Sequence, residues 1–130
     1  MPYTGTIRPR IVHFEPGHTR VQMADRRRVR NHLRSIHAVA LANLGELSSG
    51  LAVVGALGPE ARAILTGLEM TYQKKARGLL EAETQVDVPK PVTENIDLIA
   101  TAHIRDSAGE VVATAHATWR LSPLRTATRT

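Results

Sequence analysis

The most regular pattern along the chain lies in residues 36–57, where apolar residues recur at steps of three and four positions. Such spacing puts them on one face of an α-helix and predicts a helix that ends at Gly58-Pro59, a pair that interrupts helices. Ser35 is placed to cap this helix, because its hydroxyl can accept a bond from a free backbone N–H group. The predicted apolar stripe consists of Ile36, Ala40, Leu44, Leu47, Leu51 and Val54, and a second line beside it of Val39, Asn43, Glu46, Gly50 and Val53.

Outside this helix, short segments rich in Val, Ile and Thr with interleaved polar residues are typical of β-strands. Turn signals at Pro16-Gly17 and in residues 106–110 separate some of them. One helix among antiparallel strands predicts an α+β fold in which the helix packs on one sheet. The expected strands or extended segments are residues 10–16 and 18–29 before the helix, and 63–73, 79–88, 96–106 and 111–121 after it.

The composition fits one small domain. The 130 residues are 42% hydrophobic, and we expect a single domain with a core at about residues 10–121 and flexible ends. The absence of cysteine excludes disulfides and thiolate metal sites. The N-terminus lacks the apolar segment of a signal peptide, so we expect a cytoplasmic location. Residues 36–57 are long enough to span a bilayer, but their serines, glycines and single acid favour a helix buried in protein.

Glu46 is the only Asp, Glu, Lys or Arg between Ile36 and Pro59. It stands in the second line of the helix, flanked by apolar and small residues, which places it at the boundary of the core. Two interpretations remain open from the pattern alone. Glu46 is either a surface acid on a half-exposed helix, or a carboxylate held against apolar side chains as a general base.

The spacing of Asn31, His37 and Glu46 resembles that of the hotdog-fold thioesterases, in particular the PaaI-like branch and its uncharacterised relatives. That family carries Asn, then Gly three residues later, His-Gly-Gly beginning at six and Asp or Glu at fifteen. The similarity extends from about residue 10 to residue 121 and includes the strand order and residues 70–78. Here Arg34 replaces the first glycine, and Ala38-Val39 replaces the Gly-Gly pair. The resemblance implies a hotdog fold, an antiparallel sheet wrapped around one long central helix.

The resemblance also implies an acyl-CoA thioesterase that needs no cofactor. Glu46 would activate water as general base or attack the thioester carbonyl directly, and the Ala38 N–H would face the developing oxyanion. Asn31 would orient the water or the carbonyl, with a turn residue as the structural alternative. His37 would help to hold the thioester, with a helix-start histidine bonded to a backbone carbonyl as its alternative. Thr66 is the nearest candidate for the hydroxyl residue that often follows the helix.

The formal net charge of +5 suits an anionic partner. Basic residues cluster in 26–34 and 74–77, and Arg26, Arg27, Arg28, Arg34, Lys74 and Lys75 are candidates to contact the phosphates of coenzyme A. A solvated surface is the structural alternative. Nucleic-acid binding is a rival, weakened because no aromatic residues are interleaved with the basic ones. A hotdog domain that binds acyl-CoA without turnover is a further alternative.

Assembly and metal binding complete the expectations. The resemblance implies a homodimer or a dimer of dimers, with residues of both subunits in each site. The chain has six histidines, but the sequence shows no compact ligand motif. His103 and His116 lie on predicted strands at a spacing that indicates no metal set. We therefore expect neither a metal nor a membrane span.

Overall fold

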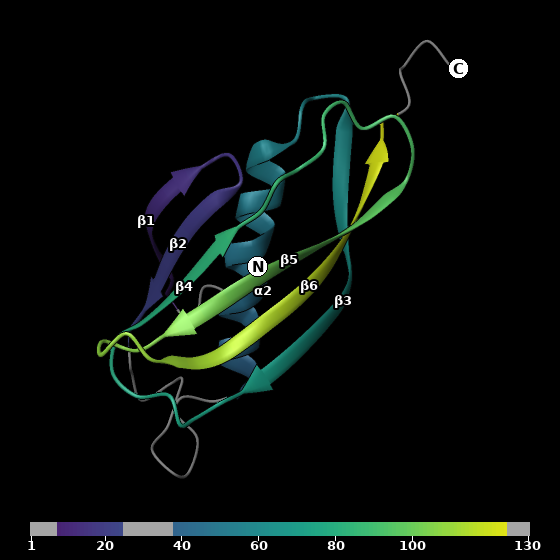
Figure 1. The fold of residues 1–130 in the computed structure, drawn as a ribbon. Coiled ribbons are helices and arrows are strands. Elements are labelled where there is room, and N and C mark those ends of the chain that lie inside the picture. Colours follow the sequence, from purple (N-terminus) through teal and green to yellow (C-terminus); the bar gives the residue numbers. More distant parts are fainter. Residues whose placement is uncertain (1–7, 25–37, 125–130) are drawn as a thin grey trace.

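The computed structural model describes residues 8–24 and 38–124, which form a six-stranded antiparallel sheet and one long helix (Figure 1). The sheet curves around the helix, and the helix contacts all six strands. This agrees with the expected α+β arrangement. The elements are β1 (Arg10–Glu15), β2 (His18–Met23), α2 (Ala38–Ala56), β3 (Ala61–Tyr72), β4 (Leu80–Gln85), β5 (Ile96–Arg105) and β6 (Val111–Pro123).

The order of strands across the sheet is β1-β2-β4-β5-β6-β3. Every predicted strand after the helix is present, and α2 ends two residues before the predicted Gly58-Pro59 stop. The part of the predicted second strand beyond Ala24 lies outside the described residues. Strand β3 pairs with β6 rather than with β4, the next strand along the chain. The sheet therefore ends in two edge strands, the short β1 and the longer β3.

The buried face of the helix overlaps only in part with the predicted apolar stripe. Leu47 and Leu51 are half-buried and pack against the core, but Val54 is 55% exposed, so the predicted stripe was wrong at Val54. The prediction from large apolar residues was incomplete because the curved sheet covers a broad sector of the helix. In that sector small residues let the helix approach the sheet more closely than large ones would. The buried residues are Ala40, Leu41, Leu44, Gly45, Ser48, Ser49, Ala52, Val53 and Ala56.

Small side chains on both surfaces set the distance between helix and sheet. A Cβ placed on Gly45 would lie 2.5 Å from the Cβ of Ala115, so the two backbones approach too closely for any side chain there. The inner face of the sheet is correspondingly rich in fully buried alanines, namely Ala82, Ala100, Ala102, Ala113, Ala115 and Ala117. The run of small residues in the helix sequence thus reflects close helix–sheet packing.

A buried hydroxyl network joins the helix to the sheet. The Thr19 hydroxyl of β2 donates to the Ser48 carbonyl at 2.7 Å, and the Ser48 hydroxyl lies 2.8 Å from that of Thr84 on β4. All three residues are completely buried. A buried polar group without a hydrogen-bond partner destabilises the folded chain. A rotation or shift of α2 against the strands would break these hydrogen bonds, so the network fixes the position of the helix.

Helix α2 is long and apolar enough to cross a membrane by length and composition, a test that core helices of soluble proteins also pass. In the fold its buried face is occupied by the sheet. The expectation of no membrane span stays a prediction.

Candidate active site

Glu46 lies on the side of α2 that faces Trp119 of β6. Residues three and four positions apart share a helix face, so Glu46 shares one with Ser49 and Gly50. A Cβ on Gly50 would lie 2.9 Å from the Trp119 ring, which therefore rests directly against the helix at this point. Trp119 pairs with Leu65 of the edge strand β3. Glu46 is half-buried and thus sits at the boundary of the core, toward the open edge of the sheet.

Two hydrogen bonds hold the helical turn that carries Glu46. The Trp119 indole N–H donates to the Ser49 hydroxyl at 3.2 Å, and this hydroxyl donates to the backbone carbonyl of Glu46 at 3.1 Å. Trp119 is only 8% exposed, so its bond to Ser49 is shielded from competing water. The carboxylate is therefore attached to a fixed backbone, which a catalytic group requires.

Asn43 lies one turn before Glu46 on the same side of the helix. Its Oδ1 is buried and has no hydrogen-bond partner, the one such side-chain atom among the described residues. An unpaired buried acceptor costs free energy, and such groups often have a functional reason.

Ala38 is the first residue of α2, and its turn contains no acidic residue. The Tyr72 hydroxyl at the end of β3 donates to the Ala38 carbonyl at 3.2 Å. Partial burial raises the pKa of Tyr72, so the phenol stays protonated as a donor. The end of β3 is thereby attached to the helix N-terminus, whose N–H groups favour negative charge.

Thr66 occupies a bulge in β3, between the register pairs of Leu65 and Gly67. It is exposed, and its hydroxyl donates to the Thr118 carbonyl at 3.3 Å. Along the same edge strand Ile64, Leu68 and Tyr72 are exposed to between 37% and 49%. A long apolar edge strand is a surface that proteins usually cover.

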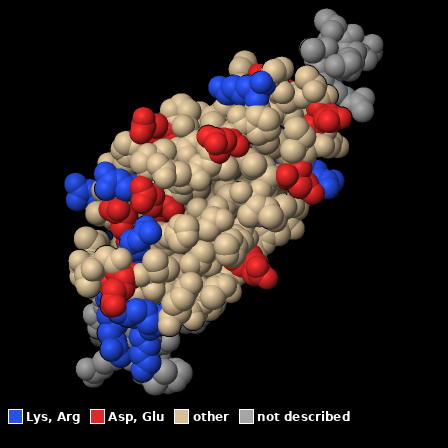
Figure 2. Space-filling view, in the orientation of Figure 1, with Lys and Arg blue, Asp and Glu red and all other residues tan. Residues whose placement is uncertain are grey.

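The basic candidates differ in their surroundings. The Lys74 ammonium is held by Glu110 and by Asp106, and these two carboxylates raise the pKa of Lys74. Lys75 is exposed. On the face shown in Figure 2, described basic side chains are interspersed with acidic ones. Of the predicted site residues, Asn31 and His37 lie outside the described residues, as do Arg26, Arg27, Arg28 and Arg34.

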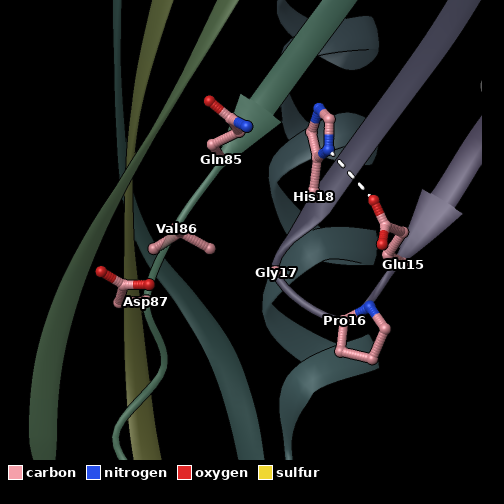
Figure 3. Close-up of a pocket in the computed structure, with 7 residues that line it drawn as sticks. All are labelled: Glu15, Pro16, Gly17, His18, Gln85, Val86 and Asp87. Atoms are coloured by element: carbon pink, nitrogen blue, oxygen red, sulfur yellow. Dashed lines mark ion pairs between the residues drawn. The ribbon is translucent and has the colours of Figure 1, made fainter.

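A cluster that the sequence did not single out lies at the tip of the β1–β2 hairpin. His13 Nε2 is 2.7 Å and His18 Nδ1 is 3.5 Å from Glu15 Oε1, and these bonds lower the pKa of Glu15. Figure 3 shows Glu15 and His18 facing each other beside a hollow of about 490 Å³ between the hairpin and the end of β4. The signal was present in HFEPGH, because the Pro16-Gly17 turn places residues 15 and 18 opposite each other.

Comparison with known proteins identifies the fold. A family model described as a domain of unknown function (DUF4442) matches residues 1–121. The structural genomics target APC5556 shares 29% identity with a TM-score of 0.86, over 95% of this chain and 82% of that one. PA5026 of Pseudomonas aeruginosa, described as a probable thioesterase, shares 22% identity with a TM-score of 0.88. The match covers 95% of this chain and 89% of that one.

A third similar structure is the thioesterase HI1161 of Haemophilus influenzae. It shares 13% identity with a TM-score of 0.82, over 96% of this chain and 85% of that one. No curated protein matches the chain. The architecture of the described residues is the hotdog fold of these neighbours, as the resemblance implied. At these identities the likeness to PA5026 and HI1161 shows a shared fold.

Proposed function

Because the chain belongs to the family described as a domain of unknown function (DUF4442) and has the hotdog fold, we propose that it hydrolyses acyl-CoA thioesters with Glu46 as the catalytic carboxylate. One observation carries the proposal. Glu46 is the only charged residue of α2, it is half-buried, and the turn that holds it is fixed by Trp119 and Ser49. A half-buried carboxylate in such a position can accept a proton from an attacking water.

The reaction needs three events at one carbonyl. Water attacks the thioester carbon while Glu46 takes its proton, and the negative charge on the carbonyl oxygen is stabilised by the Ala38 N–H. The carbon–sulfur bond then breaks, and the thiolate takes the proton back from Glu46, which yields a carboxylic acid and free coenzyme A. In the alternative path Glu46 attacks the carbonyl itself, and water hydrolyses the resulting anhydride. Asn31 and His37 are proposed to orient the attacking group and the thioester.

The two proposed groups are far apart within one chain. Ala38 and Glu46 are eight residues apart, which corresponds to about 12 Å along a helix axis. A carbonyl must lie about 3 Å from its oxyanion donor and a similar distance from its attacking group. These requirements are met more readily if the two residues come from different subunits. The exposed apolar edge of β3 supports the same proposal, a homodimer or dimer of dimers whose sites lie between chains.

Recognition of coenzyme A is proposed to use basic side chains of the chain. Lys75 is exposed, whereas Lys74 is already held by Asp106 and Glu110 and is a weaker candidate. Arg28 and Arg34 remain candidates for phosphate contacts, and Thr66 for a contact at the β3 edge. Replacement of Arg28 and Lys75 with Gln should weaken coenzyme A binding and reduce its salt dependence. Binding that ignores both changes would refute this assignment.

The decisive experiment replaces Glu46 with Gln, which keeps the shape and removes the base. We expect turnover of acyl-CoA thioesters to fall about 100-fold or more, with KM little changed. The matched control is Glu94→Gln, at an exposed position in the β4–β5 connection, which should behave as wild type. Short, medium, long and aromatic acyl groups should all be screened.

Three other experimental outcomes would each favour a different function or mechanism. If acyl-CoA binds to the wild-type protein and no thioester is cleaved, the chain is a non-catalytic binding module. If random DNA or RNA binds tightly and acyl-CoA does not, the basic residues serve nucleic acid instead. If Glu46→Gln retains full activity, the carboxylate mechanism is wrong even though hydrolysis is real.

A further inference from the structure

The strongest group of metal-binding side chains among the described residues is the cluster at the β1–β2 hairpin. It is formed by His13 and Glu15 of β1 and His18 of β2. Each offers one ligand atom, and these atoms all lie within 4.8 Å of one another. The inward residue beside them, Thr19, bonds to the helix, so His18 lies on the outer face of the sheet. The cluster is therefore separate from the helix side that carries Glu46.

We propose that His13, Glu15 and His18 form a binding site for a divalent transition metal of the zinc class. Two imidazoles and one carboxylate are a ligand set that Zn²⁺ accepts, with a fourth position left for water or another small ligand. The neighbouring hollow, lined by Glu15, His18 and Asp87 among others, gives that fourth position room. This proposal departs from the expectation that the chain binds no metal, which did not consider the three residues that the hairpin brings together.

The distances between the ligands fit the size of the ion. Metal–ligand bonds near 2.1 Å in a tetrahedron place neighbouring ligand atoms about 3.4 Å apart. His18 Nδ1 and Glu15 Oε1 are 3.5 Å apart, close to that separation. His13 Nε2 and Glu15 Oε1 are 2.7 Å apart, the distance of a hydrogen bond. The metal would replace the shared proton, and this pair would open by roughly 0.7 Å, a shift that the exposed Glu15 side chain can make.

The orientation of His18 is set by a carboxylate on the neighbouring strand. Its Nε2 lies 2.7 Å from an oxygen of Glu83 on β4, which leaves Nδ1 directed at Glu15. A carboxylate that accepts the second ring N–H of a metal-binding histidine fixes the ring and strengthens the ligand. Glu83 also pairs with Arg105 of β5. We assign Glu83 as a positioning residue for the metal site.

The hairpin that carries the three ligands is held rigidly. Gly17 adopts a φ of 81°, its N–H donates to the Ala52 carbonyl of α2, and its carbonyl accepts the Val86 N–H. A Cβ on Gly17 would lie 2.5 Å from the Val86 oxygen, so glycine is required at this turn. The turn is thereby fixed between the helix and the chain after β4, which lowers the cost of assembling the ligands.

The test is a titration of the tag-free chain with Zn²⁺ near neutral pH, followed by calorimetry. We expect saturable binding that is weakened about tenfold or more by His13→Asn, Glu15→Gln or His18→Asn. The control is His103→Asn, an exposed histidine of β5 that faces the same side of the sheet, and it should leave the affinity unchanged. Glu83→Gln should weaken binding less than loss of a ligand, because it acts through His18.

A second measurement keeps the proposal testable if one variant folds poorly. Zn²⁺ should raise the melting temperature of the wild-type chain, because it binds the folded state, and it should not raise that of Glu15→Gln. The variants and wild type should melt alike in the presence of a chelator. Absence of saturable Zn²⁺ binding, or binding that survives loss of both His13 and His18, would overturn the assignment. The cluster would then be a hydrogen-bonded ion pair only.

Discussion

The indole N–H of Trp119 donates to the hydroxyl of Ser49 at 3.2 Å, and this contact links β6, the neighbour of the edge strand β3, to the helical turn of Glu46. Neither residue is a candidate for the chemistry itself. Their pairing explains how a polar side chain is tolerated in the buried face of α2 and why the ring lies against Gly50. The position of the proposed catalytic carboxylate therefore depends on a contact between residues seventy positions apart.

We predict that Ser49→Ala lowers both stability and turnover. Alanine leaves the buried indole N–H without its acceptor, which should reduce the free energy of unfolding by about 1–3 kcal/mol. Because the Glu46 carbonyl also loses a donor, kcat should fall several-fold more than KM rises. Urea unfolding and thioester kinetics measure the two effects. Ser49→Thr, which restores a hydroxyl, should recover part of the loss, and kinetics unaffected by Ser49→Ala would exclude this positioning role.

Gly45→Ala should destabilise the fold through a steric clash. The new methyl group would meet the Cβ of Ala115 at 2.5 Å, and forcing the helix away from the sheet should cost about 1–3 kcal/mol. Gly67→Ala is the matched control, because its Cβ would have no neighbour closer than 3.8 Å. The double variant Gly45→Ala with Ala115→Gly should regain stability relative to Gly45→Ala alone. Equal thermal unfolding of the Gly45 and Gly67 variants would contradict the close approach.

The proposal of a site between two subunits predicts complementation between inactive chains. Glu46→Gln and His37→Ala should each be inactive alone. Mixed under conditions that exchange subunits, they should regain about a quarter of wild-type activity, because half of the dimers carry one intact site of two. Light scattering should show a dimer or tetramer at micromolar concentration. A mixture that stays inactive despite subunit exchange would place both residues in the same chain's site.

The β5–β6 turn should contribute stability that depends on pH. The backbone N–H of Glu110, together with Lys74 and other donors, lowers the pKa of Asp106 in the folded chain. A lowered folded pKa adds stability above the ordinary carboxyl pKa, and this contribution is lost as pH falls through the lowered folded value. Asp106→Ala should thus melt a few degrees below wild type at pH 7. The difference should shrink in acid, and a difference that is constant from pH 7 to pH 3 would contradict the role of the carboxylate.

The sequence by itself determined the helix, its end near Gly58-Pro59, the strands after it and the position of an isolated acid at the core boundary. These features depend on local periodicity and on turn residues, and both can be recognised within one short segment of the sequence. The spacing of Asn31, His37 and Glu46 further indicated the hotdog fold that the comparisons support.

Only the tertiary structure decided which face of α2 is buried, because that face is defined by a curved sheet and by small residues in contact. It also decided the placement of β3 at the far edge, the contact of Trp119 with Ser49, and the meeting of His18 with Glu83. Pairing across strands brings together residues that no local pattern connects, since the side chains in contact lie on opposite strands or on different elements. For this reason the contact of His18 with Glu83 and the buried serines of the helix could be recognised only in the folded chain.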